Sequence, residues 1–481
     1  MDLRPYQGDA LQRTRMSFSS GKRAPILVAP TGAGKTVMAS AVISGAVSKG
    51  KEIWFLAHRF ELVEQAAKKL ATCGIKHRII APASSVNSIR IKQFRELGKS
   101  WVDTTSTVSV GTIQTVNRRV GGLKEPDIII IDECHLSISP SYLNVISEHP
   151  RALVLGLTAT PTRLDGKGLG RHCGGIYDDL ILLCEPQYLV DEGFLVEPRI
   201  FASKNPLDLS GIKTSMGDYD QKELAERVDK PSLVGDAVEH YRTHAHGRPA
   251  IAFCASVKHA EHVAEKFREA GYKATAVSGE SKPEERAKAI AGLATGEFDV
   301  VCNCGLYIEG LDQPCISCVL LLTPTKSLPR FLQSVGRGLR THPGKDDCII
   351  LDHAGNVHQH GHPTDSREWT LDGTQKRKRK KQDSEDEEVK VMTCAKCFAI
   401  YKPAPVCPVC GTEHEVKERK LLVKDGQLEE LKRAEIQRQR KQQQQQAQSY
   451  EDLLALEKAN GYRPGWAAHI WRSRIAKRGR G

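Results

Sequence analysis

Short apolar runs, separated by stretches of helical periodicity, dominate the first three quarters of the chain. Each run is continuous rather than alternating, which is typical of strands buried on both faces of a parallel sheet. The runs are Pro25–Ala29, Ile53–Ala57, Asp127–Ile131, Ala152–Leu157, Ala250–Cys254, Val300–Cys304 and Ser317–Leu322. They form two sets that divide near residue 195. The sequence therefore predicts two tandem α/β parallel-sheet domains, residues 1–195 and 196–372.

The pattern weakens outside these strands. Val196–Asp229 shows little periodicity, so we expect a connector there. Residues 373–389 combine a basic run with a mostly acidic block, which predicts a solvated linker. Residues 390–416 hold a cluster of cysteines, and residues 417–481 are basic, Gln-rich and helical in character. We therefore expect a small cysteine-containing module followed by a basic helical tail.

The composition indicates the class of protein and shows how charge is distributed along the chain. Charged residues make up 27% and hydrophobic residues 40% of 481, as in ordinary soluble proteins. The apolar runs are far too short to span a bilayer, so we expect a cytoplasmic protein with no membrane partner. Residues 374–481 hold 25 Lys/Arg against 15 Asp/Glu, most of the net charge of +12. This basic end suits either a polyanionic partner or a tail that only maintains solubility.

A glycine-rich segment follows the first predicted strand and opens a helix. It reads Ala29-Pro30-Thr31-Gly32-Ala33-Gly34-Lys35-Thr36. In a phosphate-binding loop, Gly32 and Gly34 let backbone N–H groups turn toward phosphate oxygens. Lys35 would reach the β and γ phosphates of ATP, and the Thr36 hydroxyl would bind Mg²⁺. The strictest pattern has glycine in place of Ala29, and the alternative is a chance glycine-rich turn.

An acidic tetrapeptide, Asp132-Glu133-Cys134-His135, follows the apolar run Ile128–Ile131. An aspartate at the tip of a buried strand is placed to hold Mg²⁺, and an adjacent glutamate to polarise the attacking water. Acidic strand ends are common, so the tetrapeptide alone is a weak signal. Its place in the same predicted domain as the glycine-rich loop favours a nucleotide site, with Cys134 as a spacer.

Together these motifs resemble those of superfamily 2 helicases and translocases, in a DECH variant of the DEAD/DEAH box. The resemblance covers residues 3–353 and implies two RecA-like domains with ATP between them. Thr158-Ala159-Thr160-Pro161 is similar to the motif that couples hydrolysis to movement. For the first domain the resemblance implies adenine contact by Gln7, catalysis by Lys35, Asp132, Glu133 and His135, and nucleic-acid contact by Arg59, Thr112 and Gln114.

The second predicted domain completes the resemblance. Glu309-Gly310-Leu311-Asp312 resembles motif V, which implies that Gly310 and Asp312 lie at the nucleotide. The segment from Gln333 to Arg340 fits the motif VI pattern Q-x-x-G-R-x-x-R. In the family these arginines, here Arg337 and Arg340, reach the γ-phosphate across the cleft. An arginine that arrives only on closure makes hydrolysis depend on closure. The alternative is a basic pair on the surface.

Within the superfamily the chain is similar to RadD-like proteins of bacteria and their phages, which are associated with DNA repair and recombination. Leu351–Asn356, Gly344–Cys348 and the cysteine cluster carry this resemblance. It implies a DNA helicase or translocase of a bacterial or phage-infected cytoplasm, acting in repair, recombination or replication. An RNA helicase and a nucleotide-gated DNA-binding scaffold stay open as alternatives. A restriction subunit is disfavoured because the sequence shows no nuclease constellation.

The cysteine cluster consists of two C-x-x-C pairs, Cys394/Cys397 and Cys407/Cys410. Four thiolates at this spacing form the tetrahedral set that zinc prefers, and a segment this short would fold around the metal. The pattern therefore predicts a zinc ribbon over residues 390–416. A redox pair and an iron–sulfur cluster are the alternatives.

The last segment of the chain, Gly461–Arg474, interleaves basic and aromatic residues, including Trp466 and Trp471. Such a pattern suits base stacking beside phosphate contacts. It equally suits an amphipathic helix that docks its tryptophans on the motor or on repair or replication proteins. Both interpretations stay open from the sequence.

Overall fold

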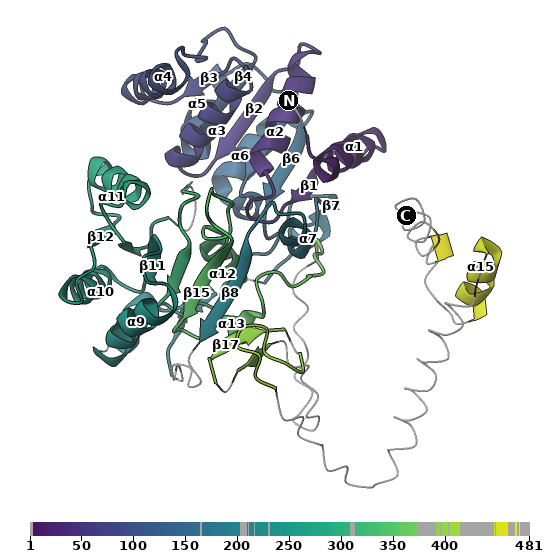
Figure 1. Cartoon of the computed structure of the whole chain (residues 1–481). Helices are drawn as coiled ribbons and strands as arrows, with labels where there is room; N and C mark the ends of the chain where they lie inside the picture. The colour runs from purple at the N-terminus through teal and green to yellow at the C-terminus, as the bar shows by residue number, and fades with distance from the viewer. Residues whose placement is uncertain are drawn as a thin grey trace. The chain divides into compact units, whose positions relative to one another are not determined.

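The computed structural model describes residues 3–163, 166–202, 209, 211–215, 217–228, 231–307, 313–372, 391–394, 396–402, 404–413, 447, 449–459, 467–468 and 471. The chain forms two compact units, Met1–His414 and Glu415–Gly481. Figure 1 shows that two sheets with surrounding helices make up the larger unit.

The first sheet is parallel throughout and has the order β3-β4-β2-β5-β6-β1-β7. Its strands are buried on both faces because alternate residues enter two different cores. Ile26, Trp54 and Ile129 lie in one core, and Leu27, Phe55 and Ile130 lie in the other. The strands are β1 (Pro25–Val28), β2 (Ile53–Ala57), β3 (Arg78–Ile80), β4 (Val108–Thr112), β5 (Ile128–Asp132), β6 (Leu153–Thr158) and β7 (Asp179–Leu182).

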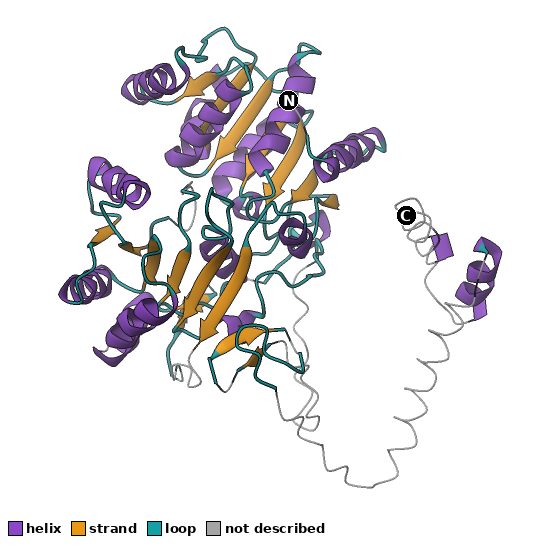
Figure 2. Ribbon diagram, viewed as in Figure 1, coloured by secondary structure: helices purple, strands orange, loops and turns teal. Residues whose placement is uncertain are grey.

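Helices cover both faces of this sheet, as Figure 2 shows in purple around the orange strands. Most connect one parallel strand to the next, as a crossover connection requires. They are α1 (Pro5–Ser19), α2 (Lys35–Val47), α3 (Phe60–Thr72), α4 (Ala83–Leu97), α5 (Ile113–Arg119), α6 (Pro140–Glu148) and α7 (Pro186–Asp191).

The second sheet has the order β12-β13-β11-β14-β15-β8-β17-β16 and is parallel from β12 through β8. Its parallel strands are β8 (Glu197–Ala202), β11 (Ala250–Cys254), β12 (Ala274–Ser278), β13 (Val300–Cys304), β14 (Cys318–Leu321) and β15 (Asp347–Asp352). Its helices are α8 (Gln221–Val228), α9 (Pro231–His244), α10 (Val257–Glu269), α11 (Pro283–Thr295), α12 (Leu328–Gly336) and α13 (Asn356–His360). The two tandem parallel-sheet domains expected for a RecA-like pair are confirmed.

The prediction of a connector over Val196–Asp229 is wrong in part, because Glu197–Ala202 forms β8, a strand of the second sheet. Glu197 and Arg199 break the apolar run that marks the other strands. Arg199 is accommodated because its guanidinium pairs with the Asp347 carboxylate on β15 at 2.9 Å. The rest of the stretch contains the hairpin β9 (Thr214–Ser215) and β10 (Asp218–Tyr219), and then α8.

The cysteine-containing module adds two strands to the second sheet. β17 (Ala399–Tyr401) pairs antiparallel with β8, and β16 (Met392–Thr393) pairs with β17. Cys394 and Cys407 are buried in the same core as Phe201 and Leu351. The module therefore shares backbone pairing and apolar core with the second domain.

After α13 the chain returns to the first domain through residues 361–372, here called the return segment. The Gly170 amide donates to the Leu371 carbonyl at 2.9 Å. Trp369 and Leu371 pack against the core that holds Ile26 and Tyr177. The Thr364 hydroxyl donates to the side-chain oxygen of Gln187 on α7 at 2.8 Å. The second domain is thus attached to the first at both of its ends.

The second unit is described around one helix, α15 (Tyr450–Ala459). Leu453 and Ala467 are buried together, with Trp471 packed against them. The Ala467 amide donates to the Glu457 carboxylate at 2.7 Å. The predicted linker 373–389, the Gln-rich tract, Gly461–Trp466, Gly310 and Asp312 lie outside the described residues. Among the residues described, the helices are all too short or too polar to cross a membrane.

Candidate functional site

The glycine-rich loop lies between β1 and α2, at the carboxyl end of the first sheet. Gly32 and Gly34 adopt φ values of 88° and 89°, which side-chain-bearing residues rarely take. A Cβ on Gly34 would lie 2.6 Å from Nε2 of Gln7, and one on Gly32 would lie 2.5 Å from Cδ2 of Leu195. The loop therefore needs glycine for conformation and for space. It ends at the N-terminus of α2, where unpaired N–H groups favour an anion.

Gln7 is buried and holds this loop. Its Nε2 donates to the Ala33 carbonyl at 3.0 Å, and its Oε1 accepts from the Arg4 amide at 3.0 Å. The Tyr6 hydroxyl donates to the same carbonyl at 3.1 Å. The structure thus gives Gln7 a loop-supporting position, and its adenine contact stays a prediction. The Arg4 guanidinium lies 3.8 Å from the centre of the Phe194 ring, a cation–π contact that the sequence did not signal.

Glu133 is the point where the predicted catalytic residues meet. Lys35 Nζ on α2 donates to Glu133 Oε1 at 2.5 Å. From the second domain, Gln333 Nε2 on α12 donates to Glu133 Oε2 at 3.3 Å. His135 Nδ1 lies 3.5 Å from the same oxygen. Glu133 has a φ of 48°, and a left-handed backbone at a residue other than glycine often marks a functional position.

The charges at this point compensate one another in a buried setting. Burial lowers the pKa of Lys35, but the carboxylates of Glu133 and Asp132 outweigh burial and the net pKa is raised. Burial raises the pKa of Asp132 to about 6, against the attraction of Lys35. Lys35 therefore stays cationic and is paired with Glu133. Phosphate oxygens arriving at the loop would compete with Glu133 for the same ammonium group.

The β6 strand end supports the acidic tetrapeptide. His135 Nδ1 lies 3.2 Å from the Thr158 hydroxyl, which donates to the Thr160 carbonyl at 3.1 Å. The Ala29 amide donates to the Thr158 carbonyl at 2.8 Å. Thr158 thus links the glycine-rich loop to His135. In the sequence, Thr158 was signalled by its place in the segment Thr158–Pro161, which resembles the motif that couples hydrolysis to movement. Burial raises the pKa of the Cys134 thiol, which agrees with a packing role.

Motif VI lies against the glycine-rich loop across the cleft. A Cβ on Gly336 would lie 2.5 Å from Cγ2 of Thr31, so the two domains touch where α12 ends. Arg337 is 8% exposed and its charge lowers the pKa of Lys35, which places the two cations near each other. The backbone of Arg340 forms a bridge with Leu195. The structure therefore places Gln333 and Arg337 at the cleft, and Arg340 beside the domain crossover.

The predicted magnesium ligands and nucleic-acid residues lie at the carboxyl edge of the first sheet. Thr36 stands in the first turn of α2, and Asp132 ends β5. Arg59 lies two residues after β2 and directly before α3. Thr112 ends the neighbouring strand β4 and caps α5, accepting from the Thr115 amide at 3.4 Å, and Gln114 is exposed on α5. The nucleic-acid contacts themselves stay predictions.

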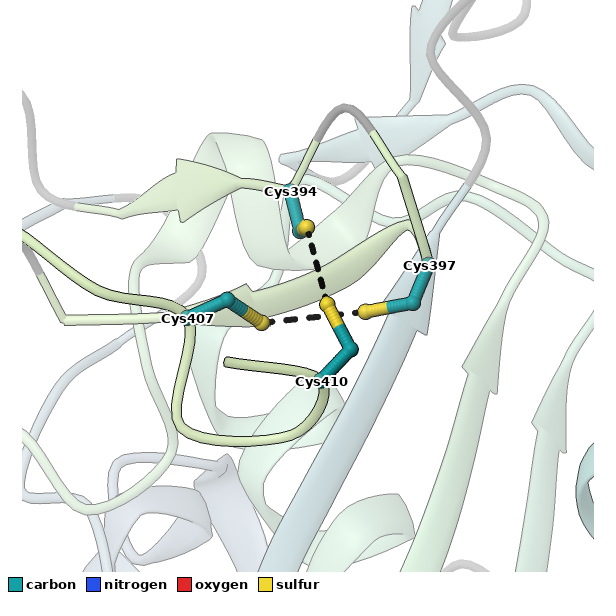
Figure 3. Close-up of side chains that lie close together, drawn as sticks. All are labelled: Cys394, Cys397, Cys407 and Cys410. Carbon is teal, nitrogen blue, oxygen red and sulfur yellow. Dashed lines mark hydrogen bonds between the residues drawn. The ribbon is translucent and has the colours of Figure 1, made fainter. Parts of the chain in front are cut away.

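The four clustered cysteines converge on one point, as Figure 3 shows. Cys394 Sγ lies 3.6 Å from Cys410 Sγ, and Cys397 Sγ lies 3.7 Å from Cys407 Sγ. Thiolates about 2.3 Å from a zinc ion at the corners of a tetrahedron lie about 3.8 Å apart. All four sulfurs lie within 4.8 Å of one another. The side chains present therefore fit one tetrahedral metal ion.

Each of the two parallel-sheet domains matches a known protein family. Residues 1–163 match "Type III restriction enzyme, res subunit", and residues 229–342 match "Helicase conserved C-terminal domain". The chain belongs to the superfamily 2 helicases. The matched ranges contain the helicase's glycine-rich loop, its acidic tetrapeptide and its motif VI, which are the residues that meet at Glu133.

Relatives extend the match over most of the helicase. A 51.5 kDa protein of a Lactococcus phage is 29% identical over 82% of this chain and 79% of its own length. The putative mitochondrial ATP-dependent helicase irc3 of Schizosaccharomyces pombe is 31% identical over 73% of this chain. This chain spans 57% of irc3. A solved fragment of a putative HsdR subunit of a type I restriction enzyme from Vibrio vulnificus has the same fold, with a TM-score of 0.56 and 21% sequence identity. The match covers 74% of this chain and 65% of that fragment.

Proposed function

We propose that this helicase is an ATP-driven motor that unwinds or translocates along DNA. The carrying observation is that Glu133 is contacted from both domains, by Lys35 and by Gln333. A site assembled from two domains is complete only when the cleft is closed, so hydrolysis depends on domain position. The names of the related helicases support ATP as the fuel, and the RadD-like resemblance supports DNA as the track.

The mechanism follows from which groups ATP would displace. Phosphate oxygens at the loop compete for Lys35, which separates Lys35 from Glu133 and leaves Glu133 to polarise the attacking water. Arg337 and Arg340 then stabilise charge on the transferred phosphoryl group. Thr36 and Asp132 would hold Mg²⁺, which neutralises phosphate charge when bound. His135 and Gln333 orient Glu133 through its second oxygen.

Nucleic acid would stimulate this cycle by favouring the closed cleft. Arg59, Thr112 and Gln114 follow adjacent parallel strands, so we propose that they contact one strand backbone at a common edge. Gly310 and Asp312 would contact the nucleotide from the second domain. The basic residues after position 414 would add phosphate contacts or bind repair or replication proteins.

We further propose the division of the chain into residues 1–195, 196–372, 373–389, 390–416 and 417–481, with zinc held by the four cysteines. The zinc would be structural, because the cluster has no open ligand position and lies in the core of the second sheet. Elemental analysis of freshly prepared protein tests this directly. About one zinc per chain is expected, whereas iron would indicate a cluster and the absence of metal would leave only a redox pair.

An ATPase assay with single-stranded DNA, double-stranded DNA, forked DNA and RNA, each alone, tests the function. We expect DNA to raise the turnover rate over the rate without nucleic acid. Stimulation by RNA alone would overturn the DNA assignment in favour of an RNA helicase. A strand-displacement assay on the forked substrate separates a motor that unwinds from a nucleotide-gated scaffold that only binds.

A further inference from the structure

Two neighbouring strands of the second sheet, β8 and β15, are followed by helices that pack on opposite faces of that sheet. β8 and β15 pair in parallel, with Phe201 beside Leu351 and Ala202 beside Asp352. The chain beyond β8 leads to α9, whose Tyr241 shares a core with Phe201 and Leu351. The chain beyond β15 leads to α13, whose Val357 lies in the other core with Ile350. Parallel sheets open a crevice at the carboxyl ends of such strands, and ligands commonly bind there.

A cavity of about 520 Å³ occupies this crevice, which we call the β8–β15 pocket. Its volume lies within the range of about 300–1,000 Å³ that is usual for ligand sites. Its walls come from β8, β15, α9 and the cysteine module, and they include Phe201, His240, His244, His353, Lys396 and Phe398. None of these residues belongs to the nucleotide site between the two domains.

The pocket is lined by flat rings. Phe201 and His244 stack with ring centres 4.1 Å apart and planes at 20°. His240 and His353 stack at 4.9 Å and 26°. Burial lowers the pKa of His353 to about 3, so that ring is neutral at physiological pH. Phe201 and His353 are buried, whereas His240 on α9 is exposed, so His240 is the ring of these stacks that another flat aromatic group can reach.

The cysteine module contributes a strained aromatic residue and a cation. Phe398 has a φ of 58°, which is unusual for a bulky side chain, and it is 41% exposed. Its carbonyl accepts from the Ala202 amide at 3.4 Å, and its amide donates to the Cys394 carbonyl at 3.1 Å. Backbone bonds on both sides therefore hold Phe398 at the pocket. Lys396, two residues earlier, lines the same cavity and supplies a positive charge.

We propose that the β8–β15 pocket binds one unstacked base of a nucleic-acid strand, with Lys396 at the adjoining phosphate. Rings that stack with a base and an ammonium group that meets the backbone are the two elements of single-strand binding. Asp236 on the pocket wall accepts hydrogen bonds from a base amino group. This inference rests on the proposed function and adds a base-binding position outside the helicase motifs. A free nucleotide offers the same chemistry without the strand.

Single-stranded DNA with one 2-aminopurine at successive positions is the probe, because stacking quenches its fluorescence. The wild type should quench the probe strongly at one position of the bound strand. His240→Ala should abolish that quenching and weaken binding by about five- to a hundredfold, with the salt slope unchanged. Arg242→Ala is the matched control, because Arg242 is exposed on the same helix and does not line the pocket. It should keep the quenching.

Lys396→Ala separates phosphate contact from stacking. It should flatten the slope of log affinity against log salt by about one unit and leave the quenching at saturation. A thermal melt of each variant excludes misfolding as the cause. Equal quenching by wild type and His240→Ala would overturn the proposal.

Two further outcomes separate this proposal from the proposed function. Saturation of the pocket by 2-aminopurine riboside monophosphate, with no position-dependent quenching on the strand, would reassign the pocket to a free nucleotide and overturn the strand assignment. Failure of the wild type to bind DNA at all would instead contradict the proposed function. The monophosphate titration would then test the pocket by itself.

Discussion

The nucleotide cleft and the cysteine cluster each bring several side chains to one point, yet they are held together in different ways. In the cleft, Lys35 and Gln333 reach Glu133 from separate domains through side-chain hydrogen bonds. In the cluster, the cysteines lie on a module that pairs by its backbone with β8 and shares the core of the second sheet. The cleft therefore depends on where the domains sit, whereas the cluster depends on whether the second domain is folded. Substitutions should separate the two kinds of dependence.

The largest effect is expected for Arg337→Ala, which removes a second-domain charge from the cleft. ATP turnover should fall by about a thousandfold or more if Arg337 stabilises the transition state. Arg337→Lys should not restore the rate, because an ammonium group lacks the planar fork of guanidinium. Single-turnover hydrolysis measures the effect, with an unchanged melting temperature as the control. A reduction of less than about tenfold would place Arg337 outside the chemistry.

Glu133→Gln should lower turnover by about a hundred- to ten-thousandfold and keep ATP binding. The amide retains the shape of the side chain but does not polarise water as a carboxylate does. Loss of the carboxylate also removes the ion pair with Lys35, so ATP affinity should stay equal or rise. Equilibrium nucleotide binding and steady-state hydrolysis together check this result. Near-normal turnover would refute the assigned site.

Cys407→Ser tests the other side of the comparison. It should release the metal and lower the melting temperature by at least about 5 °C, because the module shares the core of the second sheet. Cys73→Ser is the control, since Cys73 lies in the first domain away from the cluster. Calorimetry with elemental analysis provides both readouts. A metal-free protein with an unchanged melt would show that the module does not stabilise the motor.

The smallest effect on hydrolysis is expected when the chain is shortened after His414. Residues 415–481 carry 16 Lys/Arg and 9 Asp/Glu and form a separate unit. DNA binding should weaken, and its salt slope should flatten by about 0.7–0.9 for each phosphate that the shortened chain no longer neutralises. Turnover at saturating DNA should persist. Shortening after Glu388 would also remove the cysteine module, so only the cut at 414 isolates the tail. An unchanged salt slope would favour partner binding by the tail.

Local patterns were sufficient to predict seven of the strands, but they did not predict β3, β4, β7, β12 or β15. Ile53–Ala57, Ala250–Cys254 and Val300–Cys304 have the boundaries that their apolar runs predict, because each is buried on both faces. The loop at Gly32 and Gly34 was predictable because its backbone admits almost no other residue. These features depend on neighbouring residues alone.

Several features that the sequence did not reveal depend on distant partners. β8 contains the charged residues Glu197 and Arg199. The ion pair between Arg199 and Asp347 on β15 explains how the strand accommodates Arg199. The position of Gln7 against the Ala33 carbonyl is a tertiary contact, so a motif that implies adenine binding does not reveal it. The addition of β17 to β8 likewise follows from edge pairing that no local periodicity reports.

The return segment restricts how the two domains can move. The chain enters the second domain at Val196, whose amide is bonded to the Leu339 carbonyl, and it comes back to the first domain at Leu371. A rigid body attached to another at two points keeps one easy freedom, rotation about the line through those points. Groups on that line barely move, and groups far from it sweep the longest arcs. Each cycle of ATP hydrolysis would thus rotate the second domain about the same axis, so the direction of the domain movement would be the same in every cycle.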